Sequence, residues 1–492
     1  GNTYYSAAVR SMSSSWHAFW YGAIDSVGFV TVDKPPFSLW VQALVVRVFG
    51  FSSMSLLVPQ VLAGAAAVAL VYATIVGRWG RTAATVGATV LAIAPISVMV
   101  NHSNNTDAIL TLAMTATAWA GVRAVETGRW PWIVATGLLF GVSFTTKMLA
   151  AAPVLPAVLV AFALGAGLGW RRRTALLGAL AAIAVASALL WFTAVDLTPA
   201  SSRPYVGSSA GNSAYQLAFE RNGVNQVEGD DVMGGNGPGG NGPGGNGGNR
   251  PGGMTGFSGG EAGTLRLFNS ELGTQIGWLV VPGLAGAIAG AALSRRRRPW
   301  LEPTLVVPIV WFVGGAAAYS ITEGIVHPYY VASIVPPLAM LIGVGAGAAH
   351  RMQHRVRGSL GVGVATATAG VASWIIARRE TWTLTTRGAT IAAAAGVTLA
   401  AFVLVTRVRA HRAALFAVAA TLLLAPFAWT VGSLKAGLSA NLPYADPSAS
   451  ARGSGASPGA MGPQGSMGDD TVVDWLVAHR NGADWLVATS SA

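Results

Sequence analysis

The sequence predicts an all-α polytopic membrane protein, and three observations support this class. Of the 492 residues, 52% are hydrophobic and only 10% are charged, whereas a soluble domain carries about 25% charged residues. The mean hydropathy is +0.52. The apolar residues are gathered in runs of roughly 20 residues, which is the length that crosses a bilayer as a helix. A soluble globular protein is therefore excluded.

Twelve apolar runs of this kind follow one another along the chain. They cover residues 54–77, 80–100, 105–124, 131–147, 149–169, 174–195, 275–294, 302–321, 330–349, 358–377, 387–406 and 412–434. We expect each run to form one helix across the bilayer. The chain starts at Gly1 rather than Met and ends inside a helix-and-strand pattern, so we expect that segments are missing at both ends.

The arginines predict which side of the membrane each loop faces. If alternate loops face the cytoplasm, one side receives clusters at Arg78 and Arg81, Arg123 and Arg129, Arg171 to Arg173, Arg295 to Arg298, Arg351, Arg355 and Arg357, and Arg407, Arg409 and Arg412. The positive-inside rule makes that side cytoplasmic. Only Arg378, Arg379 and Arg387 break the alternation.

This orientation divides the chain into three predicted regions. Residues 1–53 form a first outer loop with interfacial helices, residues 54–434 form the transmembrane domain, and residues 435–492 form an extracytoplasmic tail. The domain includes an external loop at 196–274 with a Gly-rich linker at 234–253. The tail begins with a flexible linker, because a stretch so rich in Ser, Gly and Pro cannot bury enough apolar surface to fold. The helix-and-strand pattern that follows is expected to be the start of a small outer domain.

The acidic residues gather on the predicted outer side. Of the 19 carboxylates, only Glu126 and Glu302 map to cytoplasmic ends of spans. The absence of cysteine excludes thiolate nucleophiles and zinc–thiolate sites. The net charge of +12 comes from arginines between apolar runs, which is not the basic patch that binds nucleic acid. A reactive site is therefore expected among the outer loops.

The first outer loop contains the motif Asp33-Lys34-Pro35-Pro36, after an aromatic stretch that begins with Tyr4 and Tyr5. The two prolines prevent helix formation and fix the direction of the preceding carboxylate and ammonium. At a bilayer surface this pair suits a phosphate-bearing lipid, because Lys34 can pair with phosphate while Asp33 orients or deprotonates a hydroxyl. The alternative is an interfacial turn with a local ion pair.

Four further outer segments carry polar side chains beside apolar spans. The turn from Asn101 to Asp107 includes His102, Asn104 and Asn105. The alternative explanation for Asp107 is that its carboxylate caps the helix that follows and complements the helix dipole. The other three segments contribute Lys147, the pair Arg203 and Tyr205, and the group His327, Tyr329 and Tyr330. Lysine at an outward helix end is costly unless an anion pairs with it, but snorkelling is an alternative. Arg203 could clamp phosphate, whereas His327 and the tyrosines could equally belong to an interfacial belt.

These motifs together resemble the GT-C membrane glycosyltransferases of the protein mannosyltransferase and aminoarabinose transferase (ArnT-like) superfamily, in a bacterial branch. The resemblance spans most of residues 1–335 and rests on Tyr4-Tyr5, Asp33-Lys34-Pro35-Pro36, Asp107, Thr146-Lys147, the stretch from Asp196 to Tyr205, and His327-Pro328-Tyr329-Tyr330. It implies a GT-C-like bundle of about thirteen spans, one of them before Gly1. It also implies transfer of a sugar from a polyprenyl-phosphate donor on the outer face.

The resemblance makes Lys34 the donor-phosphate contact, Asp107 a second acid of the cavity, and Lys147 part of a matching Thr-Lys pair. Relatives usually carry an acidic residue, the proposed base, just before the tyrosines, where this chain has Gly1-Asn2. The catalytic base is then sought among Asp107, Asp33 and Asp25. Asp107 is favoured slightly over Asp33, because Asp33 would compete with the donor phosphate for Lys34, and Asp25 is favoured least.

We therefore expect a multi-pass plasma-membrane glycosyltransferase with its active site on the extracytoplasmic face. Its partners would be a polyprenyl-phosphate-linked sugar, a glycan, lipid or protein acceptor of the cell envelope, and membrane lipids, with no nucleic acid. No cofactor is required, although a divalent cation could bind among the outer acids and His102 or His327. A secondary transporter would call for an internal repeat and mid-membrane charges, which the sequence does not show. A non-catalytic envelope-assembly protein would use the Gly-rich loop and tail and need no acid cluster.

Overall fold

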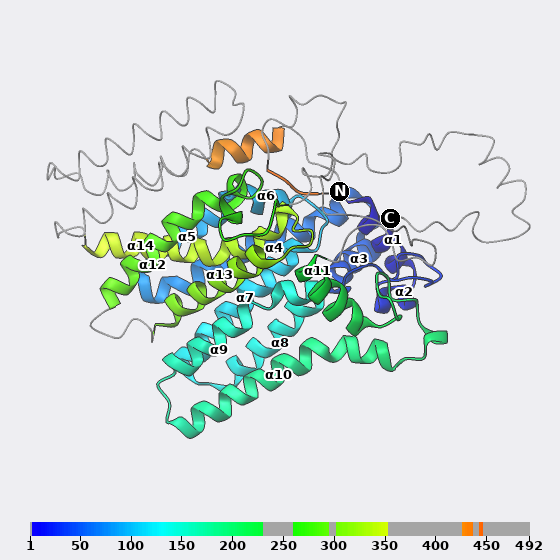
Figure 1. Ribbon diagram of the computed structural model, residues 1–492, viewed down its shortest axis with the longest axis horizontal. Coiled ribbons are helices and arrows are strands. Elements are labelled where there is room, and N and C mark those ends of the chain that lie inside the picture. Colours follow the sequence, from blue (N-terminus) through cyan, green and yellow to red (C-terminus); the bar gives the residue numbers. More distant parts are fainter. Residues whose placement is uncertain (1, 230–258, 295–301, 353–425, 436–441, 446–492) are drawn as a thin grey trace, which may run out of the picture.

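The computed structural model describes residues 2–229, 259–294, 302–352, 426–435 and 442–445. Within these ranges the chain is a bundle of helices (Figure 1). Extended pairing in the same ranges is limited to single bridges between Ala23 and Thr31 and between Val30 and Tyr205. The predicted all-α class is confirmed. The expected spans at 358–377 and 387–406, the Gly-rich linker and the tail from residue 446 lie outside the described residues.

The helices follow one another in the order in which the apolar runs appear. The α-helices are α1 (Thr3–Ser14), α2 (Trp16–Tyr21), α3 (Phe37–Phe49), α4 (Ser53–Trp79), α5 (Arg81–Ile93), α6 (Pro95–Asn101), α7 (Asp107–Thr127), α8 (Trp130–Lys147), α9 (Val154–Gly165), α10 (Trp170–Leu197), α11 (Asn225–Glu228), α12 (Trp278–Ser294), α13 (Pro303–Ile321) and α14 (Val335–Met352). The shorter 3₁₀ and π elements are η1 (Met148–Ala151), η2 (Ala200–Ser202), η3 (Gln216–Val224), η5 (Arg266–Phe268), η6 (Gly273–Gly277) and η9 (Pro328–Ile334).

Seven helical stretches in the described part of the chain are long and apolar enough to cross a membrane. They are 53–79, 107–127, 130–151, 170–197, 273–294, 303–321 and 328–351, and each coincides with a predicted span. The predicted span at 80–100 is instead broken into α5 and α6, which are bent by 62°. The break lies at Pro95, whose ring cannot continue the preceding helix. Only residues 426–434 of the predicted span at 412–434 are described, and they are helical.

The predicted span at 149–169 also differs from the structure. Its first residues form η1 and extend the stretch that begins with α8, and only the twelve residues of α9 remain as a separate apolar helix. Pro153 precedes α9 and Met148 turns the chain after α8, so one continuous helix through both segments is not formed.

Helices pack closely where glycine meets glycine. In the pair α12 and α14, a Cβ atom on Gly286 would collide with the carbonyl oxygen of Leu341, and one on Gly345 would lie 2.7 Å from the Gly286 Cα. Small residues let membrane helices approach until their backbones touch. In lipid the hydrophobic effect does not hold helices together, so this van der Waals contact stabilises the pair instead. This pair lies beside α5 and α13, and the pairs α7–α8 and α8–α10 build the other half of the bundle (Figure 1).

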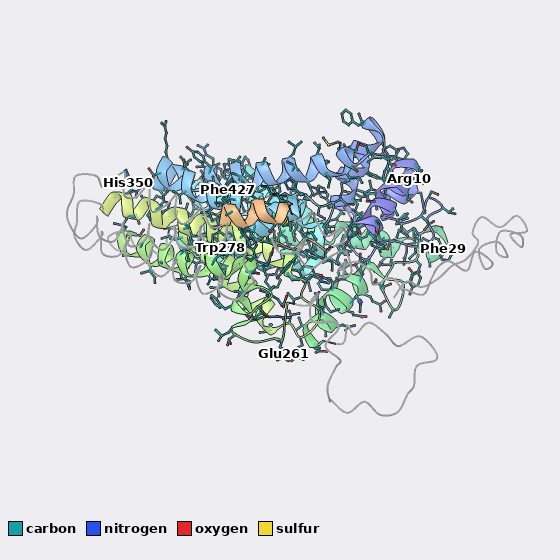
Figure 2. All side chains as sticks on the ribbon, turned by 90° about the horizontal axis from the view of Figure 1, so that it is seen from above. Arg10, Phe29, Glu261, Trp278, His350 and Phe427 are labelled. Atoms are coloured by element: carbon teal, nitrogen blue, oxygen red, sulfur yellow. The ribbon has the colours of Figure 1, made fainter. Side chains whose placement is uncertain are left out.

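The N-terminal helices form a small unit at one end of the bundle, where Figure 2 places both Arg10 and Phe29. Helices α1 and α3 bury Val9, Met12 and Leu39 between them. Phe29 and Phe49 in the same segment are exposed, with 75% and 76% of their area accessible. Exposed aromatic side chains of this kind are what an interfacial segment presents to lipid.

The last described residues are attached to the bundle near the break between α5 and α6. Thr430 donates a 2.9 Å hydrogen bond to the carbonyl oxygen of Ile93, the last residue of α5. Gln275 in η6 bonds both the N–H and the C=O of Ala445, at 3.1 and 3.0 Å. Trp429 donates to the same carbonyl at 3.0 Å. Thr430 and Ala445 are therefore hydrogen-bonded to the central helices, and Trp429 is bonded to Ala445.

Candidate active site

A buried ion pair joins the start of α7 to the end of α8. The Nζ atom of Lys147 lies 2.7 and 2.8 Å from the two carboxylate oxygens of Asp107. Both side chains are almost completely buried, with 6% and 3% of their area exposed. Asp107 is in the first turn of its helix and Lys147 in the last turn of its own, so each charge also complements a helix dipole.

The aromatic residues of the late motif surround the Lys147 ammonium. The Nζ atom lies 3.9 Å from the ring centre of Tyr330 and 5.1 Å from that of Tyr329. The His327 ring stacks on Tyr329, with centroids 5.3 Å apart and an interplanar angle of 8°. Cation–π contact and the carboxylate together replace the water that a lysine loses on burial.

The backbone after Lys147 is strained. Met148 has φ +48° and ψ −129°, a conformation that residues with a Cβ rarely adopt, and its side chain is buried. Such a residue costs on the order of 1–3 kcal/mol and persists only where the surroundings hold it. It ends α8 abruptly, so that the Lys147 side chain stays beside Asp107.

The second charged pair is Asp33 with Lys34. The Lys34 Nζ lies 2.8 Å from Asp33 Oδ2 and also donates to the Asp33 carbonyl oxygen at 3.2 Å. The Asp33 side chain is 35% exposed and that of Lys34 is 12% exposed, so this pair is more accessible than the Asp107–Lys147 pair. The N–H of Asp33 donates to the Tyr4 hydroxyl at 3.1 Å, and the Tyr5 hydroxyl lies 3.5 Å from Asp33 Oδ1.

These contacts set the ionisation of the groups in the first outer loop. Burial is the largest single effect and raises the pKa of Asp33, but the Lys34 ammonium, its hydrogen bond, a backbone hydrogen bond and the Lys147 charge together bring the net pKa below the usual value. Burial and then the Asp33 charge raise the pKa values of Tyr4 and Tyr5. At neutral pH the loop therefore presents an ionised carboxylate between two protonated tyrosine hydroxyls.

The two charged pairs belong to one site. Lys147 is close enough to interact electrostatically with both Asp33 and Lys34. Tyr5 likewise interacts with Asp107 and Tyr330, which come from other segments. The structure thus brings together the first outer loop, the start of α7, the end of α8 and the segment around Tyr330, which the sequence placed on the same side.

The asparagines of the 101–107 turn bind the beginning of the first outer loop. Asn104 donates to the carbonyl oxygen of Asn2 and to the Ser6 hydroxyl, each at 3.0 Å. The Asn2 side chain donates to Asn105 at 3.2 Å. Asn2, which stands where the resemblance places an acid, therefore links α1 to this turn. His102 donates from Nδ1 to the Val98 carbonyl oxygen at 2.9 Å, within its own helix end.

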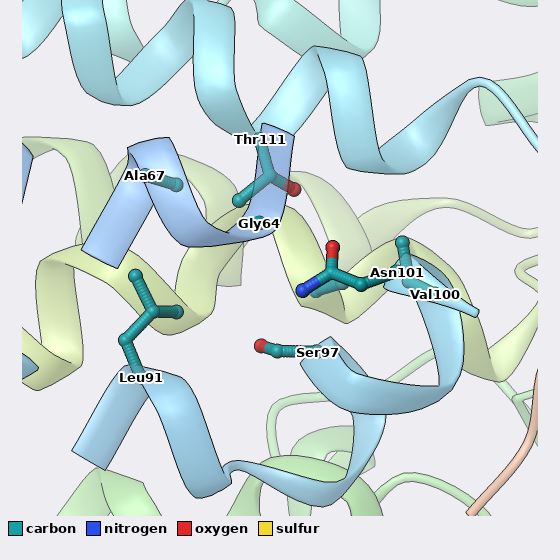
Figure 3. A pocket seen from close by; sticks show the side chains of 8 residues that line it. Gly64, Ala67, Leu91, Ser97, Val100, Asn101 and Thr111 are labelled. Atoms are coloured by element: carbon teal, nitrogen blue, oxygen red, sulfur yellow. The ribbon is translucent and has the colours of Figure 1, made fainter. Parts of the chain in front are cut away.

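A small pocket lies beside this turn, at the break between α5 and α6 (Figure 3). Asn101 projects into it against Gly64. The buried hydroxyls of Ser97 and Thr111 also line it and have no hydrogen-bond partner among the described residues. Buried polar groups of this kind are normally satisfied by ordered water or by a polar group of a ligand.

Three of the predicted residues hold loops in shape instead of facing the two charged pairs. The carboxylate of Asp25 accepts the N–H groups of Gly28, Phe29 and Val30 at 2.7 to 3.1 Å. The Arg203 guanidinium binds the Asn212 side chain and carbonyl oxygen at 2.8 and 2.7 Å. The Tyr205 hydroxyl donates to a carbonyl oxygen four residues away, that of Ser209.

One site residue, Asn222, was missed by the sequence analysis. It lies in the π-helix η3 of the external loop, and its Oδ1 accepts from Lys34 Nζ at 3.1 Å. π-Helices occur often at functional sites, but this nine-residue π-helix leaves no clear mark in the sequence. The dipeptide Asn222-Gly223 signals only a turn.

The described part of the chain contains no group of three or more His, Asp or Glu residues that could hold a metal ion. His102 and His327 in particular are engaged by a helix carbonyl and by tyrosine rings. The expectation that no cofactor is required therefore stays a prediction.

Comparisons with known proteins give consistent matches. The family model described as "Dolichyl-phosphate-mannose-protein mannosyltransferase" matches residues 33–192. Two proteins of Bacillus subtilis (strain 168) are similar in sequence. "Putative mannosyltransferase YkcB" is 31% identical over 100% of this chain and 79% of its own length. "Putative mannosyltransferase YycA" is 32% identical over 71% of this chain and 60% of its own length.

Solved structures of ArnT from Cupriavidus metallidurans share the fold. The apo structure has a TM-score of 0.50 at 18% identity, and covers 89% of this chain and 74% of ArnT. The structure bound to undecaprenyl phosphate has a TM-score of 0.51 at 19% identity, and covers 88% of this chain and 73% of ArnT.

The buried pair predicts a large coupling between two substitutions. Asp107→Asn leaves an unpaired ammonium in the interior, and Lys147→Met leaves an unpaired carboxylate, so each should lower the free energy of unfolding by about 3–5 kcal/mol. The double variant should lose clearly less than the sum. Thermal unfolding in detergent measures this, with Glu126→Gln, which breaks the exposed pair with Arg123, as a control expected to cost at most about 1 kcal/mol. Additive losses would contradict the assignment.

Proposed function

Because the chain belongs to the GT-C family of bacterial membrane glycosyltransferases, we propose that it transfers a sugar from a polyprenyl-phosphate donor to an acceptor of the cell envelope. The donor class is supported by the name of the matching family model, which includes dolichyl-phosphate-mannose. It is also supported by the ArnT structure that holds undecaprenyl phosphate, although its 19% identity shows only a common fold. The protein is a multi-pass membrane protein, as its apolar helices indicate.

The ammonium of Lys34, which is less buried than that of Lys147, is the observation that carries the proposal. It lies in the first outer loop, in the segment where the family match begins, and 12% of its side chain is exposed. Lysine binds phosphate as a point charge, and such charge-assisted contacts are stronger than neutral hydrogen bonds. Lys147 is less suited to this role, because Asp107 already takes two of its contacts and Tyr330 covers it.

The same pair supplies the two charges that glycosyl transfer needs. An acceptor hydroxyl gives its proton to a carboxylate as its oxygen forms a bond to the anomeric carbon. The bond from that carbon to the phosphate oxygen breaks, and its electron pair stays on the polyprenyl phosphate. Lys34 stabilises the charge that develops on this leaving group. The proton then passes from the carboxylate to solvent.

The contacts of the three candidate carboxylates lead us to place Asp33 ahead of Asp107 as the base. Both oxygens of Asp107 are bound to Lys147 in the interior, and those of Asp25 accept backbone N–H groups. Asp33 is the most exposed of the paired acids, and its Oδ1 has only the long 3.5 Å contact with Tyr5. An ammonium directs its three N–H bonds apart, so Asp33 and a donor phosphate can occupy different directions on Lys34.

The active site is proposed to face the outside, because the arginine clusters mark the opposite ends of the spans as cytoplasmic. The chain has no cysteine, so single cysteines can be introduced as reporters. Val27→Cys, in the first outer loop, should react with a membrane-impermeant maleimide in intact cells, because Val27 is 67% exposed. Arg171→Cys should react only after permeabilisation. The reverse pattern would place the active site on the cytoplasmic face and contradict the proposal.

Removal of the phosphate contact should reduce turnover without unfolding the protein. Lys34→Ala deletes a charge-assisted hydrogen bond worth about 1.5–3 kcal/mol, which corresponds to a loss of about 10- to 100-fold in kcat/KM. Transfer of labelled sugar from a polyprenyl-phosphate donor in purified membranes measures it. Lys435→Ala makes the same substitution in the C-terminal helix and should retain activity. An unchanged rate for Lys34→Ala would remove this residue from the mechanism.

The depressed pKa of Asp33 predicts a difference between two pH profiles. In the free protein this carboxylate is ionised down to below its usual pKa, so the acid limb of kcat/KM that Asp33 causes should lie below about pH 4. A bound phosphate anion disfavours ionisation, so the acid limb of kcat should lie at higher pH.

The matching substitutions identify the group responsible for the acid limb. Asp33→Asn should reduce kcat by about 100- to 10,000-fold, as expected for loss of a general base. Asp25→Asn keeps an oxygen acceptor for the loop and should remain active within a few-fold. Turnover that survives in Asp33→Asn but is lost in Asp107→Asn, with the latter still folded, would restore Asp107 as the base.

A further inference from the structure

The Lys34 ammonium has no free hydrogen-bond donor in the structure. It donates to Asp33 Oδ2 at 2.8 Å, to the Asp33 carbonyl oxygen at 3.2 Å and to Asn222 Oδ1 at 3.1 Å. An ammonium has three N–H bonds, so these acceptors use all of them. A phosphate oxygen can bind Lys34 directly only if one of the three acceptors is displaced.

The three acceptors differ in how firmly they hold the ammonium. Asp33 Oδ2 is an ionised carboxylate at a short distance, and such a contact is about twice as strong as a neutral one. The Asp33 carbonyl belongs to the residue before Lys34 and stays close by covalent connection. Asn222 is uncharged and comes from another segment, so it is the acceptor that an anion displaces most readily.

The orientation of the Asn222 amide is determined by its partners. Its Nδ2 donates to the Leu217 carbonyl oxygen at 2.8 Å, and its Oδ1 faces Lys34. A carbonyl can only accept and an ammonium can only donate, so the reversed amide would lose both hydrogen bonds. Asn222 therefore presents an oxygen to Lys34, as a phosphate would.

The segment that carries Asn222 reaches the site from the external loop. Gly223, the next residue, packs near Leu149 in η1, two residues after Lys147. The following helix α11 is tied by backbone hydrogen bonds of 2.9 Å to Glu323 and Gly324, just before the segment that carries Tyr330. The π-helix is thus held in place by η1 and by the segment that contains Glu323 and Gly324. Only the side chain of Asn222 has to move to release Lys34.

We propose that Asn222 Oδ1 occupies the position on Lys34 that an oxygen of the donor phosphate takes when the donor binds. This inference rests on the proposed function, because it assumes a phosphate at Lys34. It makes Asn222 a positioning residue: without donor it fixes the ammonium, and as a neutral amide it leaves the charge of Lys34 available for phosphate. An acidic residue at position 222 would compete with the donor through its own charge.

The test compares two substitutions with opposite expected signs. Asn222→Ala removes the acceptor that competes with phosphate for Lys34, so it should tighten binding of a polyprenyl monophosphate about 3- to 10-fold. This is about the change in affinity expected when one hydrogen bond to a charged group is removed at a partly exposed site. Asn222→Asp introduces a charged competitor and should weaken binding by about 10- to 100-fold. Titration of the purified protein in detergent with the polyprenyl monophosphate measures both.

Two controls separate this effect from folding and from general electrostatics. Gln216→Glu adds the same charge to the same π-helix and keeps the oxygen that accepts from the Gly211 N–H, so it should bind the monophosphate as the unmodified protein does. The matching polyprenol, which has no phosphate, should not distinguish among the variants. Unchanged thermal unfolding shows that each variant is folded.

The outcomes distinguish the inference from the proposed function. If Asn222→Ala and Asn222→Asp weaken binding equally, or if neither changes it while Lys34→Ala abolishes it, the placeholder role is wrong and the phosphate contact of Lys34 stands. If the unmodified protein binds polyprenyl monophosphate no better than polyprenol, both the donor class and the inference are wrong.

Discussion

The ion pair between Asp107 and Lys147 is the constraint on which this end of the bundle depends. Two charges with so little exposure are tolerable only while they remain in contact, because either alone would pay the full cost of leaving water. The start of α7 and the end of α8 must therefore remain side by side. The other parts of the site attach to these two ends: α1 through Asn104, and the late aromatic segment through Tyr330.

The two lysines of the site have different surroundings and therefore different uses. Lys147 is held by a full carboxylate and two aromatic rings, so its charge is neutralised inside the protein. Lys34 is bound by one carboxylate, that of Asp33, and by the uncharged amide of Asn222, and it retains some contact with solvent. A rigid, neutralised pair beside a less buried one keeps the site folded while the proposed lipid-phosphate donor binds and leaves.

Much of the fold could be predicted from the sequence, because a span of apolar residues leaves few alternatives to a membrane helix. The broken span at Pro95 was missed, since hydropathy averages over the proline that interrupts the run. Within the site, Asp33 and Lys34 could be recognised because consecutive prolines fix them locally. The pairing of Asp107 with Lys147 could not, because it depends on how two helices pack. Asn222 could not be found either, since its partner lies 188 residues away along the chain.

Local contacts also explain why some predicted residues have other partners. Asp25 precedes Gly28 in a turn, and a short carboxylate in that position readily accepts the backbone N–H groups that follow. Arg203 finds its partner nine residues away, at Asn212, within the same outer segment. For residues of these types, a nearby backbone group is a competitor that sequence reasoning about ligands tends to overlook.

The hydrogen bonds from Thr430 and Ala445 to the bundle limit how far the chain can be shortened. The family match ends at residue 192, before the external loop begins, but contacts of the bundle reach as far as Ala445. A chain that keeps Gln275 and ends before residue 426 would lose the Thr430 hydroxyl that reaches the last carbonyl of α5. It would also leave both polar atoms of the buried Gln275 side chain without Ala445. A chimera with a relative should therefore exchange α5, η6 and the residues around Thr430 and Ala445 together.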